Sequence, residues 1–386
     1  MRAGLLTLCV LVAVAIATLD ATRATADDVK PRLVQSYDAP AGDPLGDRLR
    51  GRAWTYDSAV TAVARAQTGD LDGAGALLDA LQDVQRPDGA LEGSYDLTGR
   101  DGAGPVRAGN QAWAGLAALQ WRALTCSGRH DRLLTGLARW LLAHRIDDPR
   151  SPGFGLVRGG PDVTWASTEH NLETRAFFAG LDAALSGRAI DPAAAPCPPG
   201  LDGLSPAATS TLRRDVHDAV ARLDRAIEAE LFVRDGGGRA HFGQGLDDDT
   251  RPLDVQALGI LWLVGQGRAD DARAVERFTD KTMRVHGRRV DWPGASTKTF
   301  IGYRPFAAYG PDVLWMEGTL AMRLAKARLG SSVAELDRSA DRWAALTAPR
   351  APLQVNRAGG EDYHVWPAAA PAAWLVISRS SFALLQ

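Results

Sequence analysis

Apolar positions along the chain follow the 3.6-residue period of α-helices, and the strict alternation typical of β-strands is nearly absent. The helical segments come in pairs, and the pairs recur. The first helices of successive pairs begin near Asp57, Asn110, Glu169, Asp254, Trp315 and Ala372. These starts lie about 53 to 61 residues apart, except for one interval of about 85 residues that contains a proline-rich insertion at residues 192–206. Regular spacing of this kind predicts stacked helical hairpins.

The two helices of a pair differ in how their apolar residues are distributed. Residues 254–263 are apolar on nearly every side, which is typical of a helix that is buried all round, whereas residues 269–282 carry more charge. An inner and an outer ring of helices would require this difference. Five complete hairpins and one further helix come close to the six hairpins of a closed toroid. We therefore predict an all-α fold, an (α/α)6 toroid with about eleven helices in two rings, rather than an open array.

The first 26 residues have the features of a secretory signal peptide. Arg2 precedes an apolar run from Leu5 to Leu19, and Ala24-Thr25-Ala26 fits the small-x-small cleavage rule. The run is short for a membrane span, so we expect cleavage and a periplasmic or secreted protein, with an uncleaved anchor as the alternative. Residues 27–50 would then form an N-terminal segment, and residues 51–386 would form the toroid.

Composition narrows the choice of partners and cofactors. The 386 residues carry a net charge of -2, which gives no electrostatic basis for binding nucleic acid. No Walker, dinucleotide or CxxC motif is present, and we predict no cofactor, no metal site and no membrane contact after cleavage. The two remaining cysteines, Cys126 and Cys197, each follow the first helix of their pair. Both should lie on the face opposite the helix starts, where we expect a disulfide. The oligomeric state is left open.

Polar and aromatic residues gather at the starts of the first helices. The candidate substrate-binding residues are Trp54, Tyr56, Asn110, Trp113, Trp165, His170, Asn171, Asp254, Gln256, Asp312 and Trp315. If these helices form the inner ring, their starts lie on one rim and the side chains converge on one concavity. Indole rings beside carboxylates and amides suit a sugar, because pyranose rings stack on aromatic faces while hydroxyls form hydrogen bonds. Helix capping, for example by Ser167 or Thr168, and core packing of each tryptophan are the alternatives for single residues.

Five segments together carry a resemblance to a known superfamily. They are Thr55-Tyr56-Asp57, Gly109-Asn110-Gln111-Ala112-Trp113, Ser167-Thr168-Glu169-His170-Asn171, Leu253-Asp254-Val255-Gln256-Ala257-Leu258-Gly259 and Trp315-Met316-Glu317-Gly318-Thr319. From about Trp54 to Leu385 the chain resembles the six-hairpin glycosidase superfamily, and more narrowly its poorly characterised exported bacterial members. The resemblance implies a toroid with a carbohydrate-binding cleft and hydrolysis of glycosidic bonds, most often with inversion. The twelfth helix of the superfamily is missing here or is supplied by the segment before Trp54.

Glycoside hydrolysis needs one protonated and one ionised carboxyl group on either side of the bond. We predict Glu169 as the general acid, because apolar neighbours such as Trp165 could raise its pKa. Asp57 or Glu317 is the predicted general base, since each comes from another hairpin and could face Glu169. Glu173, one helical turn beyond Glu169, could be a structural neighbour instead.

Three functions remain open at this point. The first is an exported glycosidase that cleaves a polysaccharide or oligosaccharide substrate. The second is a sugar epimerase or polysaccharide lyase with His170, His241 or His364 as base, although the other helix starts offer no histidine. The third is a glycan-binding or polysaccharide-export accessory protein without catalytic activity. These residues do not set the identity of the sugar, its linkage, or endo or exo action.

Overall fold

The structure, a computed structural model, describes residues 32–191, 194–235, 237–293, 295, 299–307, 313–357, 363–383 and 385. The predicted signal peptide at residues 1–26 and the candidate residue Asp312 lie outside these ranges. Within them the chain forms twelve α-helices, of which eleven have at least seven residues, and only short strands. The prediction of an all-α fold with about eleven long helices is confirmed.

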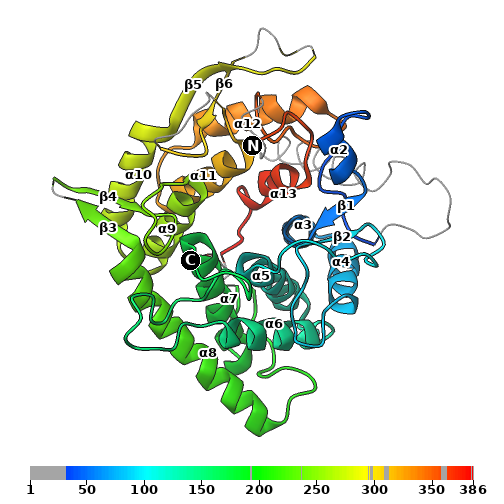
Figure 1. Cartoon of the computed structure of the whole chain (residues 1–386), viewed down its shortest axis with the longest axis vertical. Coiled ribbons are helices and arrows are strands. Elements are labelled where there is room, and N and C mark those ends of the chain that lie inside the picture. Colours follow the sequence, from blue (N-terminus) through cyan, green and yellow to red (C-terminus); the bar gives the residue numbers. More distant parts are fainter. Residues whose placement is uncertain are drawn as a thin grey trace.

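Six helices form an inner ring around a central axis (Figure 1). They are α3 (Thr55–Thr68), α5 (Ala108–Thr125), α7 (Thr168–Ser186), α9 (Leu253–Gly265), α11 (Met316–Arg328) and α13 (Ala369–Ile377). The outer ring consists of α4 (Leu71–Asp83), α6 (Asp131–Ala143), α8 (Pro206–Ala226), α10 (Ala269–Met283) and α12 (Ala334–Thr347). Each of these outer helices follows an inner one in sequence and packs against it, so the helices form a closed (α/α)6 toroid.

Three two-stranded antiparallel sheets connect the helices. Strand β1 (Arg52–Trp54) pairs with β2 (Ser94–Asp96), β3 (Phe232–Asp235) with β4 (Arg239–Phe242), and β5 (Arg284–Arg289) with β6 (Thr299–Tyr303). A short π-helix, Ile227–Leu231, links α8 to β3. The β3–β4 and β5–β6 pairs lie at the outer edge of the toroid, whereas β1 leads directly into the inner helix α3 (Figure 1).

Hydrophobic burial explains the two rings. In the inner helix α7, Phe177 and Phe178 are both 0% exposed, although neighbouring residues of a helix point in different directions. The outer helix α8 instead buries one stripe at three- and four-residue intervals, which consists of Leu212, Val216, Ala219, Leu223 and Ala226. Despite the apolar inner helices, none in the described ranges is both long enough and apolar enough to span a membrane.

The segment before α3 closes the ring. The N–H of Asp38 donates a hydrogen bond to Pro367 O at 2.9 Å, and the N–H of Ala369 donates to Ser36 O at 2.9 Å. The short helix α2 (Pro44–Leu49) lies outside α13, and α13 packs against α3 (Figure 1). The segment before Trp54 therefore takes the outer position of the sixth hairpin, which was one of the two alternatives for the missing twelfth helix.

Cys126 and Cys197 form the predicted disulfide, with their Cα atoms 5.2 Å apart. Cys126 is the C-cap of α5, so the bond lies at the end of the inner ring opposite the helix starts. The insertion that contains Cys197 is also tied to the second hairpin, because the guanidinium of Arg122 donates a hydrogen bond to Gly200 O at 2.9 Å. These contacts fasten adjacent hairpins together on the far face.

Candidate active site

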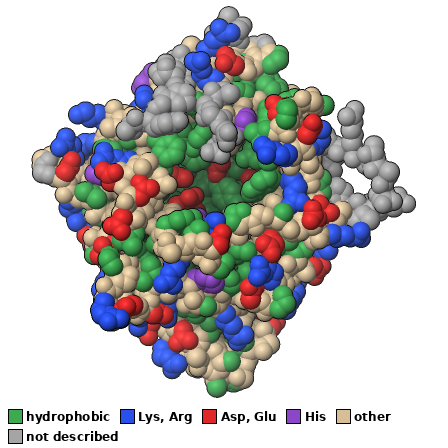
Figure 2. Space-filling view, in the orientation of Figure 1, with side chains coloured by type: hydrophobic (Ala, Val, Ile, Leu, Met, Phe, Trp, Pro, Cys, Tyr) green, Lys and Arg blue, Asp and Glu red, His purple; other side chains and the backbone are tan. Residues whose placement is uncertain are grey.

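A cavity of about 430 Å³ opens at the centre of one face of the toroid, bounded by the N-terminal ends of the inner helices and the loop between α4 and α5 (Figure 2). The residues that line it are Trp54, Tyr56, Gly93, Ser94, Gly104, Pro105, Arg107, Gly109, Asn110, Trp113, Glu169, His170, Glu173, Asp254, Leu258, Trp315, Glu317, Gly318, Ala321 and Trp374. Figure 2 shows hydrophobic side chains on its floor and acidic side chains on its wall. The expected convergence of distant helix starts on one concavity is present.

The position of a residue within its inner helix decides whether it reaches the cavity. The second residues of five inner helices line it, namely Tyr56, Gly109, Glu169, Asp254 and Glu317. The sixth residues line its deeper part, namely Trp113, Glu173, Leu258, Ala321 and Trp374. Residues four apart lie on the same face of a helix, so α5, α7, α9 and α11 each present residues to the axis at two depths.

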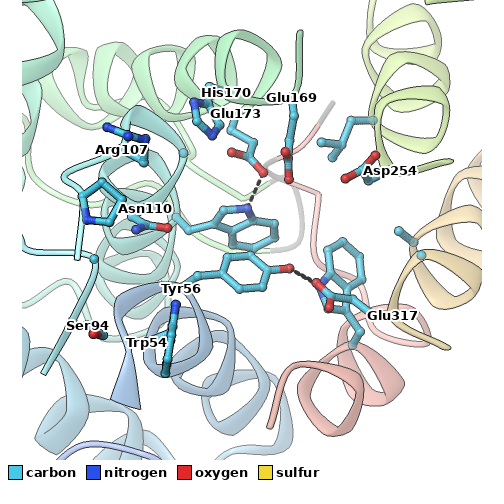
Figure 3. Close-up of a pocket in the computed structure, with 18 of the residues that line it drawn as sticks. Trp54, Tyr56, Ser94, Arg107, Asn110, Glu169, His170, Glu173, Asp254 and Glu317 are labelled. Carbon is cyan, nitrogen blue, oxygen red and sulfur yellow. Dashed lines mark hydrogen bonds between the residues drawn. The ribbon is translucent and has the colours of Figure 1, made fainter. Parts of the chain in front are cut away.

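Four carboxyl groups point into the cavity, from Glu169, Glu173, Asp254 and Glu317 (Figure 3). Burial raises the pKa of each group, because the ionised form loses its hydration. The pKa of Glu317 rises to about 8 and that of Asp254 to about 6. The pKa values of Glu169 and Glu173 are raised well above the usual range, since burial acts together with neighbouring acids. Near neutral pH the cavity therefore holds both protonated and ionised carboxyl groups.

Glu317 lies at the end of a directed hydrogen-bond chain. The indole Nε1 of Trp374 donates to the hydroxyl of Tyr56 at 2.8 Å, and this hydroxyl donates to Oε1 of Glu317 (Figure 3). An indole N–H can only donate, so the Tyr56 oxygen accepts from Trp374 and its own proton is free to bind Glu317. The bond from Tyr56 lowers the pKa of Glu317 against the larger effect of burial. Oε1 of the ionised Glu317 accepts this bond.

Glu173 is held deep in the cavity by Trp113, whose Nε1 donates to Oε1 of Glu173 at 2.5 Å. Glu173 is 2% exposed and Trp113 is 1% exposed. Gly109 leaves the room that this arrangement needs. A Cβ at position 109 would lie 2.6 Å from Cδ2 of His170 and 2.9 Å from Oε2 of Glu173. The absence of a side chain at Gly109 thus allows α5 to approach the acidic face of α7.

The side of the cavity between α5 and α7 carries Arg107, Asn110 and His170 (Figure 3). The guanidinium of Arg107 pairs with Asp162, with Nη1 and Oδ1 2.5 Å apart. Burial, together with the charge of Arg107, lowers the pKa of His170 to about 4, so its imidazole is neutral at pH 7. The candidate Trp165 lies beside His170 with the ring centroids 5.5 Å apart, outside the lining of the cavity.

The polar side chains at the fourth positions of three inner helices form hydrogen bonds with the backbone of preceding segments and do not line the cavity. Gln256 is 0% exposed; its side chain donates to Phe242 O at 2.8 Å and accepts from the N–H of Phe242 at 2.9 Å. Asn171 binds the backbone of Val157 in the same way, at 3.1 and 2.7 Å. Gln111 makes the same pair of bonds for α5. We expected Asn171 and Gln256 to contact substrate, but their hydrogen bonds hold backbone groups of the segments that precede their helices, Val157 and the end of β4 at Phe242.

Asp57, one of the two candidate bases, also lies outside the cavity lining. It is the third residue of α3, and Tyr56 before it points into the cavity instead. Asp57 is 6% exposed and accepts a hydrogen bond from Ser36, and burial raises its pKa to about 7. The other candidates, Trp54, Tyr56, Asn110, Trp113, Glu169, His170, Asp254, Trp315 and Glu317, line the cavity together.

The lining residues that escaped the sequence analysis include Arg107 and Trp374, and Glu173 was considered only as a structural neighbour. The four-residue spacing from Glu169 is the signal that places Glu173 in the cavity. Arg107 is the N-cap residue of α5 and carries no motif of its own. In the described ranges, no group of three or more histidine, cysteine, aspartate or glutamate residues is placed to hold a metal ion.

No protein-family model matches the sequence, and a comparison with curated proteins gives no significant match. Solved structures do match. A glycosidase variant with one glutamate replaced by alanine, in complex with glucose, has a TM-score of 0.67 at 15% identity over 100% of both chains. A metal-independent alpha mannosidase of Streptococcus pneumoniae, in complex with alpha-1,6-mannobiose, has a TM-score of 0.60 at 11% identity over 95% of this chain and 92% of its own.

The fold is that of the six-hairpin glycosidases. The six-hairpin toroid is not restricted to hydrolases, since D-mannose isomerase matches with a TM-score of 0.59 at 10% identity over 100% of this chain and 97% of its own. The chemistry performed on this six-hairpin toroid therefore has to be argued from the cavity.

Proposed function

We propose that the protein is an exported glycoside hydrolase that cleaves an oligosaccharide or polysaccharide with inversion, using Glu169 as general acid and Glu317 as general base. The observation that carries this proposal is the placement of the two glutamates. They come from the second positions of α7 and α11, two inner helices separated by α9, and both face one aromatic-walled cavity (Figure 3). Two carboxyl groups that face each other across a sugar are what glycoside hydrolysis requires.

Glu169 is suited to donate a proton. Burial is the largest cause of its raised pKa, and the nearby charges of Asp254 and Glu317 raise it further. The raised pKa favours the protonated carboxyl, which can transfer its proton to the glycosidic oxygen as the bond from that oxygen to the anomeric carbon breaks.

Glu317 is suited to accept a proton in its ionised form, which, with a pKa of about 8, predominates above that pH. Tyr56 holds one of its oxygens, and a water molecule between Glu317 and the anomeric carbon would lose a proton to the carboxylate as it attacks. Attack from the side opposite Glu169 inverts the configuration of the anomeric carbon. The pKa of Asp254 is about 6, below that of Glu317 at about 8, so at neutral pH its negative charge is available to stabilise the positive charge that develops on the sugar ring.

Export is supported by the disulfide, because such bonds persist in oxidising compartments. A sugar isomerase is the second candidate, and the fold shared with D-mannose isomerase favours it. Among the described residues that line the cavity, however, His170 is the sole histidine, whereas four are acids. This balance of residues favours hydrolysis, which requires carboxyl groups alone.

The test combines a panel of oligosaccharides with ¹H NMR of the first product formed. Wild type should release reducing sugar, and the first anomer detected should be inverted relative to the substrate. Glu169→Gln should lose on the order of 10²-fold or more in kcat for sugar leaving groups and less for activated aryl glycosides, which need little protonation. Glu317→Gln should lose kcat by similar factors for substrates with sugar leaving groups and for activated aryl glycosides.

Glu230→Gln is the matched control, because Glu230 is exposed and outside the cavity. It should behave as wild type. Retained turnover in both Glu169→Gln and Glu317→Gln would exclude the assigned roles. Interconversion of free sugars without hydrolysis would replace the proposal by the isomerase.

A further inference from the structure

Trp165 stands out among the large apolar side chains of the described residues. It is 43% exposed, and the other exposed large hydrophobic residues in these ranges, Leu124 and Val233, are aliphatic. The tryptophans that line the cavity floor are buried, Trp113 at 1% and Trp374 at 3% exposed. An indole that serves the core is buried in the same way, so Trp165 calls for another explanation.

The exposed ring is nevertheless held in place. It packs on Gly159, where a Cβ would lie 1.9 Å from Cζ3 of the indole, so that no larger residue fits beneath it. The N–H of Gly159 also donates to Trp165 O at 2.9 Å. The guanidinium of Arg107 lies 5.6 Å from the ring centroid, and Asp162 and the carbonyl of Val106 fix that guanidinium. The indole is thus oriented before any ligand binds, which lowers the entropic cost of binding.

Trp165 lies on the side of the cavity where the leaving group of the substrate is expected. It precedes Glu169 by four residues, and its ring lies 5.5 Å from that of His170, which lines the cavity. In the proposed mechanism, Glu169 protonates the oxygen that departs. The part of the substrate attached to that oxygen therefore lies on the Glu169 side of the cavity, where Trp165 is exposed.

We propose that Trp165, together with Arg107 and His170, forms a binding subsite for the sugar ring of the leaving group. This inference rests on the proposed hydrolase function. The C–H face of a pyranose stacks on an indole, and this contact suits a sugar because it needs flat apolar surface without a deep pocket. Around the indole, the guanidinium of Arg107 can donate to sugar hydroxyls, and the neutral imidazole of His170 can donate or accept.

The experiment compares two substrates that share one glycone: the shortest oligosaccharide cleaved by wild type, and the matching glycosyl fluoride, whose leaving group carries no sugar. In Trp165→Ala, the ratio of kcat/KM for the oligosaccharide to kcat/KM for the fluoride should fall at least about tenfold, mainly through KM. Trp165→Phe should restore part of the ratio, because a smaller aromatic face remains. Leu124→Ala removes an exposed apolar side chain near the opposite end of α5 and should keep the wild-type ratio.

An equal loss on both substrates would overturn the subsite, since it would mean that Trp165 only supports Glu169. A wild-type ratio in Trp165→Ala would overturn it as well. Either result leaves the hydrolase proposal standing. If wild type cleaves no glycoside of the panel, the hydrolase proposal fails, and the subsite falls with it.

Discussion

The hydroxyl of Tyr56 donates a hydrogen bond to Oε1 of Glu317, although the two residues are 261 positions apart in the sequence. The indole of Trp374 donates to the same Tyr56 oxygen and so helps to hold the hydroxyl in place. The proposed base is therefore positioned by residues from the first and last inner helices. The pKa of Glu317 therefore depends on Tyr56, which the sequence analysis predicted only as a substrate-binding residue.

Tyr56→Phe should move the acidic limb of the pH profile of kcat/KM to higher pH. The hydrogen bond from Tyr56 lowers the pKa of Glu317, so its loss raises that pKa and the ionised base persists only at higher pH. Trp374→Phe keeps the Tyr56 hydroxyl and should produce a smaller shift. A uniform loss of rate at every pH, without movement of the limb, would show that Tyr56 serves only in packing or sugar binding.

Asp254→Asn should move the whole pH profile to lower pH. The charge of Asp254 raises the pKa of both Glu169 and Glu317, so removing it lowers both values. Because the pKa of Asp254 is itself about 6, the group is charged mainly above that pH, and the effect should be largest there. The matched control is Asp218→Asn, an exposed acid on α8. If the two limbs of the pH profile do not move in Asp254→Asn, then the charge of Asp254 does not raise the pKa values of Glu169 and Glu317.

Cys126→Ser should destabilise the fold and spare catalysis. Removing a disulfide that joins residues 71 positions apart costs about 2–4 kcal/mol of unfolding free energy, chiefly by freeing the unfolded chain. The bond lies at the opposite end of the inner ring from the cavity, so kcat should stay at the wild-type value. Urea unfolding measures the first effect, and Cys197→Ser should match it. A loss of turnover at temperatures where the variant remains folded would argue against this separation.

Gln256→Leu should lower stability by leaving two buried backbone groups without partners. The N–H and the carbonyl of Phe242 both bind the Gln256 amide, and an unsatisfied buried polar group costs about 1–3 kcal/mol. Thermal unfolding should detect the loss. Gln266→Leu, at the exposed end of the same helix, should change stability by only about 0.5 kcal/mol. Equal melting temperatures for the two variants would mean that the loop finds other partners.

The sequence predicted where inner helices begin, but not which neighbouring residue faces the axis. The first helix, predicted to begin near Asp57, begins at Thr55, so its start is nearly right. Successive helical residues, however, are rotated by about 100° from one another, so the orientation of the helix decides between Tyr56 and Asp57. That orientation depends on packing, including the contact of Asp57 with Ser36 in a segment far from the helical repeat. Hydrophobic periodicity contains no information on such a contact.

For the same reason, the pattern of polar residues at helix starts was only partly a signature of the site. The amide of Asn171 and the carboxyl of Glu169 lie two positions apart, yet one binds the Val157 backbone and the other lines the cavity. Both are polar groups in the first turn of α7, and sequence alone does not separate their roles. Distinguishing them requires the position of the preceding loop, which the fold supplies.

Closure of the ring between the segment before α3 and the start of α13 has a consequence for how the protein is made. The hydrogen-bond chain of Trp374, Tyr56 and Glu317 crosses this junction, so it cannot exist while the C-terminal helix is still being synthesised. Hairpins formed early can bury their apolar faces against one another, but Glu317, the proposed base, then lacks a tyrosine partner that Trp374 holds in place. Enzymatic activity would therefore report on completion of the chain, and a fragment that lacks α13 would fold in part without acquiring a working site.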